Sequence, residues 1–166
     1  MAGQVPRPRA RKGVRSMSDD ATPGSSSSAV PRGAEITDAE RLLLRVLREI
    51  WCEMGAVSAQ NFRPAGQDQD LMSVDRGDKS SPAESFDRSV ALRPVGVAGL
   101  TVAEVRGASL KAFDDPEDAP PNPAHAVVDF RNLKRKEQER RSKLLRARAA
   151  QRGCLHPSGF VLQFPC

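Results

Sequence analysis

The chain has 166 residues, a formal net charge of +5 and 39% hydrophobic residues, which predicts one compact domain and excludes a fully disordered chain. Its three cysteines, Cys52, Cys154 and Cys166, form no CxxC pair and are odd in number, so the composition excludes a disulfide framework and a zinc ribbon. No apolar run is long enough to cross a bilayer, and the basic N-terminus lacks the apolar stretch of a secretory signal. We therefore expect a cytoplasmic protein without membrane contact.

The first 35 residues combine Pro, Gly, a run of four serines and scattered Arg, with almost no large apolar side chain. Such a composition cannot bury enough surface to offset the entropy of ordering the chain. We predict that residues 1–35 form a disordered basic arm, that residues 36–160 form a single compact domain, and that residues 161–166 form a short tail.

The first predicted element is an amphipathic helix over Asp38–Met54. Thr37 and Glu40 have the spacing of a reciprocal capping box, and Gly55 has the conformational freedom to end the helix. Apolar residues recur at intervals of three and four, as on one face of a helix. These residues are Leu43, Val46, Leu47, Ile50, Trp51 and Met54.

The middle of the chain predicts short strands between polar loops. A strand is expected over Leu71–Val74, and two β-rich pieces are expected on either side of Pro94, which suits a strand end. Thr101 and Glu104 repeat the capping-box spacing, which predicts a short helix over Val102–Arg106. The stretch SLKAF is a further strand candidate, and an acidic, proline-rich loop follows it.

The stretch HAVVDF predicts a strand whose core face carries Ala126, Val128 and Phe130. After it, a basic helix is expected from Asn132 or Lys134 to Arg152, and the stretch GFVLQF can add a last strand or pack as a tail. The fold class is therefore α+β: a small sheet of short strands, an N-terminal amphipathic helix and a basic C-terminal helix.

The basic helix carries the strongest charge feature of the chain. Residues 131–152 hold ten Lys or Arg and two Glu, whereas residues 36–130 have a net charge of −6. Leu144 and Leu145 are the expected anchors of a thin apolar stripe. Two interpretations stay open: a solvated or self-neutralised helix, and a surface that binds a polyanion. The candidate polyanion-binding residues are Arg131, Lys134, Arg135, Arg140, Lys143 and Arg146.

Catalytic motifs are missing from the sequence. It contains no phosphate-binding loop, no HExxH and no nucleophile elbow, and Cys154 with His156 supplies too few ligands for a zinc site, so we expect no metal and no cofactor. One enzyme hypothesis remains, because polar residues flank several predicted strands. Its candidate catalytic residues are Arg63, Asp75, Arg76 and His125.

The stretches FRP, LMSVDRG, RPVGVAGLTVAEV, NPAHAVVDF and RGCLHP follow one another over residues 62–157. In this order the chain resembles small uncharacterised bacterial proteins. The resemblance implies a bacterial source and a shared compact domain, and it assigns no activity to any residue.

The sequence thus predicts a noncatalytic binding protein whose basic C-terminal helix contacts nucleic acid or an acidic protein partner. The alternative is a small RNA- or nucleotide-directed, toxin-like enzyme with a site near Arg63, Arg76 and His125.

Overall fold

The computed structural model describes residues 33–53, 56–66 and 68–156, and these residues form an α+β fold around one antiparallel sheet. The six strands of the sheet follow the order β10-β5-β1-β4-β9-β6. The predicted α+β class is confirmed, whereas the tail and residues 1–32 of the arm lie outside the described residues. The elements are β1 (Leu42–Arg48), η1 (Glu49–Trp51), β2 (Cys52–Glu53), β3 (Ala56–Val57), η2 (Ala59–Phe62), β4 (Leu71–Arg76), α1 (Pro82–Arg88), η3 (Val90–Leu92), β5 (Pro94–Thr101), α2 (Val102–Gly107), β6 (Lys111–Asp114), β7 (Glu117–Asp118), β8 (Pro121–Asn122), β9 (His125–Asp129), α3 (Arg135–Arg152) and β10 (Cys154–His156).

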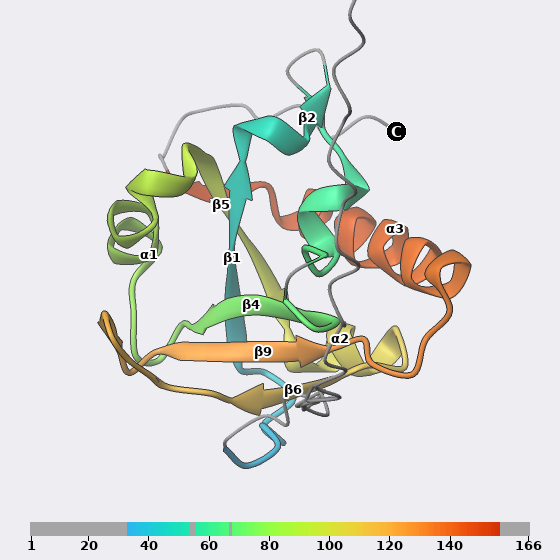
Figure 1. Cartoon of the computed structure of the whole chain (residues 1–166), viewed down its shortest axis with the longest axis horizontal. Coiled ribbons are helices and arrows are strands. Elements are labelled where there is room, and N and C mark those ends of the chain that lie inside the picture. The colour runs from blue at the N-terminus through green and yellow to red at the C-terminus, as the bar shows by residue number, and fades with distance from the viewer. Residues whose placement is uncertain (1–32, 54–55, 67, 157–166) are drawn as a thin grey trace, which may run out of the picture.

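The sheet changes direction between β1 and β4. β1 pairs with β5 from Leu42 to Arg48, but it pairs with β4 only through Leu43↔Arg76 and Leu44↔Asp75. In Figure 1, β4, β9 and β6 run across the direction of β1 and β5. The two strands therefore separate beyond Leu44, which opens a space between them on the side of η1 and η3.

The prediction of a helix over Asp38–Met54 is wrong. Residues 42–48 form the central strand β1, and the predicted capping box at Thr37 is replaced by a turn in which the Asp38 side chain accepts a hydrogen bond from the Glu40 N–H. Met54 and Gly55 lie outside the described residues. A central strand is covered on both faces, so it can be apolar without alternation, and a short apolar run of this kind fits either a strand or a helix.

Several other predicted elements are confirmed. β9 covers His125–Asp129 with Ala126 and Val128 in the core, and β4 covers the strand predicted near Leu71–Val74. α2 begins at the predicted capping box, in which the Thr101 side chain accepts from the Glu104 N–H while the Glu104 side chain accepts from the Thr101 N–H. The capping-box spacing therefore predicted a helix correctly at Thr101 and wrongly at Thr37, while the alternation of HAVVDF predicted its strand correctly.

Helix α1 was not predicted. Ser81 and Glu84 form a reciprocal capping box, and Pro82 occupies the first helical position, where its missing N–H costs no hydrogen bond. The stretch around Pro94 also differs from the expectation. Val90–Leu92 forms the turn η3, and Pro94 is the first residue of β5.

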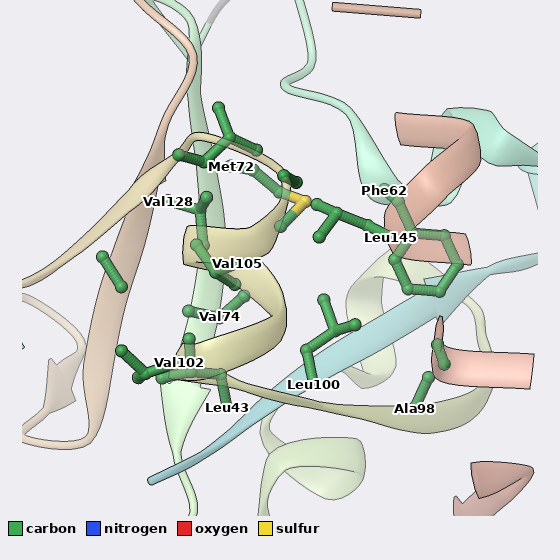
Figure 2. Packing of buried hydrophobic residues seen from close by; sticks show 14 of the residues in the cluster. Leu43, Phe62, Met72, Val74, Ala98, Leu100, Val102, Val105, Val128 and Leu145 are labelled. Atoms are coloured by element: carbon green, nitrogen blue, oxygen red, sulfur yellow. The ribbon is translucent and has the colours of Figure 1, made fainter. Parts of the chain in front are cut away.

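The hydrophobic core joins both halves of the bent sheet to α2, α3 and η2. Leu43 and Leu100 come from β1 and β5, and Met72 and Val128 come from β4 and β9. Figure 2 shows Leu145 pointing from α3 into this cluster, on the side of Met72 and Phe62. The core thus fixes α3 against the sheet.

The two leucines predicted as anchors of α3 behave differently. Leu145 is fully buried, with an exposed fraction of 0%, whereas Leu144 is 37% exposed. Ser142 and Ala149 are the other buried residues of α3. Because only small side chains accompany Leu145, the helix lies close to the core and leaves most of its circumference to solvent.

Candidate nucleic-acid interface

The solvent side of α3 is basic along its length. It is formed by seven exposed residues, which we call the outward face: Lys136, Arg140, Lys143, Leu144, Ala147, Arg148 and Gln151. Four of the seven are cations and none is an acid. An 18-residue helix is about 27 Å long, so these charges lie along an extended surface.

Carboxylates along the flanks of α3 neutralise part of the charge. Glu137 accepts hydrogen bonds from Arg140 at 2.7 and 3.0 Å and from Arg141 at 2.8 Å. These hydrogen bonds, from Arg140 first and Arg141 second, lower the pKa of Glu137 to about 2. Near the end of the helix, Arg152 pairs with Glu104 of α2 at 3.0 Å.

Other cations of α3, and Lys134 just before it, have no such partner among the described residues. Within the described part of the chain, no carboxylate lies within ion-pair distance of Lys134, Lys136, Lys143, Arg146 or Arg148. Three of these five belong to the outward face. Carboxylates therefore neutralise only part of the charge of α3: on the outward face Arg140 is paired with Glu137, whereas Lys136, Lys143 and Arg148 have no carboxylate partner among the described residues.

Glu137 predicts a pH-dependent contribution of α3 to stability. Its pKa falls from 4.5 to about 2 on folding, so the ionised carboxylate stabilises the fold above pH 4.5 and loses this effect as pH falls towards 2. In urea unfolding followed by circular dichroism, we expect Glu137→Gln to be less stable than the wild type at pH 6. The difference should shrink steadily as the pH is lowered below 4.5, and a constant difference across this range would contradict the assignment.

Of the residues predicted from sequence to bind a polyanion, some are paired with a carboxylate in the structure and others are not. Arg131 lies before the helix and is held by Asp129 through its Nε at 3.0 Å and its Nη2 at 2.8 Å. Arg135 is 85% exposed but lies 3.5 Å from Glu139. Arg140 is bound by Glu137, whereas Lys134 and Lys143 are exposed and have no carboxylate partner among the described residues.

Arg146 lies on the flank of α3, half-buried, and its Nε makes no hydrogen bond within the described part of the chain. Sequence reasoning did not select Lys136 and Arg148, although both are on the outward face. Leu144 and Leu145 were both expected to be anchors, and Arg148 is one turn away from Leu144 on the helix. Because Leu144 is exposed, this side of the helix lies in solvent, and Arg148 is exposed as well.

The four candidate catalytic residues do not share one site. Arg63 pairs with Glu139 of α3 at 3.3 Å, and Arg76 pairs with Asp78 and Asp114 at 2.8 and 2.6 Å. Asp75 and His125 are cross-strand partners in β4 and β9 and line a common pocket. That pocket contains neither Arg63 nor Arg76, so the enzyme hypothesis loses two of its four residues.

The pocket beside Asp75 and His125 has a volume of about 210 Å³ and lies where β1 and β4 separate. Asp75 accepts hydrogen bonds from Arg88 at 2.8 Å and Asn122 at 2.9 Å. The Nδ1–H of His125 donates to the backbone oxygen of Asp115 at 2.6 Å. In the neutral ring this tautomer leaves Nε2 as an acceptor.

No family model, no curated protein and no solved structure matches this chain. Within the described residues, no helix combines the length and apolar character that crossing a bilayer requires. The same residues contain no group of three or more His, Cys, Asp or Glu arranged to hold a metal ion. A functional assignment therefore depends on charge and geometry alone.

Proposed function

We propose that this chain is a noncatalytic nucleic-acid-binding protein that contacts the phosphate backbone through the outward face of α3. The observation that carries the proposal is that Lys136, Lys143 and Arg148 are exposed there without a carboxylate partner in the described part of the chain. Cations of this kind gain free energy from a polyanion because binding releases its condensed counterions.

Nucleic acid fits this face better than an acidic protein does. Protein partners obtain most of their binding energy from a buried apolar or aromatic centre, and the only large apolar side chain of the outward face is the partly exposed Leu144. Phosphate contacts need no such centre. Binding should therefore depend on backbone charge and carry little sequence preference.

The partner is identified by equilibrium binding to a fluorescently labelled duplex of about 20 base pairs at about 50 mM salt, a concentration at which nonspecific phosphate contacts are detectable. We expect saturable binding that unlabelled DNA or RNA displaces and that polyglutamate of matched charge displaces poorly. Equal displacement by polyglutamate would show that the face recognises negative charge of any kind, and an absence of binding to the duplex would reject the proposal.

A further inference from the structure

The pocket between β1 and β4 contains a buried charge that lacks a carboxylate partner. Arg45 is only 8% exposed, and its Nε and Nη1 donate to the backbone oxygens of Asn61 and Ser73, each at 2.6 Å. Burial lowers the pKa of Arg45 to about 10, so the guanidinium is still charged at neutral pH. A buried charge is costly without an opposite charge, and a bound anion would supply one.

The acidic residues that line the pocket do not form an ion pair with Arg45. Asp75 is bonded to Arg88 and Asn122, and no carboxylate of the described residues lies within ion-pair distance of Arg45 or Arg48. The charge of Asp68 attracts Arg45 only from beyond ion-pair distance. The Asp68 carboxylate accepts a hydrogen bond from the Ala65 N–H at 3.3 Å. The pocket thus offers two guanidinium groups to a ligand.

One wall of the pocket is flat. The guanidinium carbon of Arg48 lies 4.4 Å from the centre of the Trp51 ring, which is the geometry of a cation–π stack, and the Nε of Arg48 is buried without a hydrogen bond in the described part of the chain. A planar base can extend such a stack on the guanidinium plane.

Two apolar side chains from η1 and η3, Trp51 and Leu92, line the pocket beside its polar groups. The Glu49 N–H donates to the Arg93 oxygen at 3.1 Å and so holds η1 beside η3. Leu92 lines the pocket and is 47% exposed, whereas Ile50, which is 77% exposed, lies outside the pocket lining. An exposed aliphatic side chain and an indole in one pocket favour a ligand that is partly apolar and flat.

From these observations we propose that the pocket between β1 and β4 binds a nucleoside monophosphate, either as a free nucleotide or as the end of a nucleic-acid strand. The base stacks on the Arg48–Trp51 wall, and the phosphate accepts hydrogen bonds from Arg45 and Arg48. No residue of α3 lines the pocket. The site is therefore independent of the interface proposed for α3, and the two proposals can fail separately.

Trp51 gives a direct readout because the chain contains one Trp and no Tyr. Titration of the full chain with adenosine 5′-monophosphate, followed by tryptophan emission and by calorimetry, should show saturable binding. Adenosine and ribose 5-phosphate should each bind at least about tenfold more weakly, since each lacks one half of the recognised group. Equal binding by inorganic phosphate alone would overturn the proposal, as would a lack of saturation.

Arg48→Gln should weaken binding of adenosine 5′-monophosphate about tenfold, which is the size of one lost charge-assisted hydrogen bond. Arg93→Gln is the matched control, since Arg93 is an exposed neighbour outside the pocket and its variant should bind as the wild type does. Equal weakening by both changes would overturn the proposal. Competition by a 5′-phosphorylated single-stranded tetranucleotide would identify a strand end as the source, and its failure to compete would identify the free nucleotide; either result is compatible with the site.

Discussion

Leu145→Ala should destabilise the protein by about 2 to 5 kcal/mol, the usual cost of removing a buried leucine and leaving a cavity. Leu145 is fully buried and is the one large apolar side chain that α3 places in the core. The total stability of a domain of this size is about 5 to 15 kcal/mol, so the loss would be a large part of it. Urea unfolding monitored by circular dichroism measures the change.

Leu144→Ala is the matched control for Leu145→Ala. The two leucines are adjacent in sequence, but Leu144 is 37% exposed, and we expect its removal to change the free energy of unfolding by no more than about 0.5 kcal/mol. Similar losses for the two variants would mean that α3 is rotated about its axis relative to the structure. The outward face would then contain different residues, and the proposed function would have to be revised.

The second large effect is expected in binding. Changing Lys136, Lys143 and Arg148 together to Gln removes the three cations of the outward face that have no carboxylate partner in the described residues. Each is a potential phosphate contact, so affinity for a duplex at low salt should fall at least about a hundredfold. Unfolding of the triple variant should match the wild type, because the three side chains are exposed.

The control for the triple variant carries the same change in net charge elsewhere. Lys79, Arg106 and Lys111 are exposed, and they lie 3.6, 3.8 and 2.8 Å from carboxylates of Asp114 or Glu35. Their replacement by Gln should lower affinity for the duplex much less than the α3 changes do. If the two triple variants lose affinity equally, net charge governs the association and α3 has no special role.

The sequence predicted the elements that are defined by local signals. Alternation predicted β9, reciprocal capping predicted α2, and the basic run between Phe130 and Gly153 predicted α3. The strand β1 was not predicted because it is covered on both faces by elements that are distant in the sequence. Leu43 and Leu47 face the core while Leu44 lines the pocket on the other face, and a run that is buried on both faces has no strand period.

The candidate site was predictable only in outline. Sequence alone showed that α3 is basic, but not which of its cations are paired. Arg152 is paired with Glu104 from α2, and Arg141 donates to the backbone oxygen of Ser109. Such contacts join residues far apart in the chain. The pocket was not predictable at all, because it depends on the separation of β1 from β4.

The salt dependence of duplex binding by the full chain tests the central claim most directly, since each phosphate contact contributes about 0.9 to the slope of log affinity against log salt. Three to four contacts from the outward face predict a slope between about −2.7 and −3.6. A slope near zero, or an absence of binding at about 50 mM salt, would contradict the claim that the outward face of α3 binds phosphate.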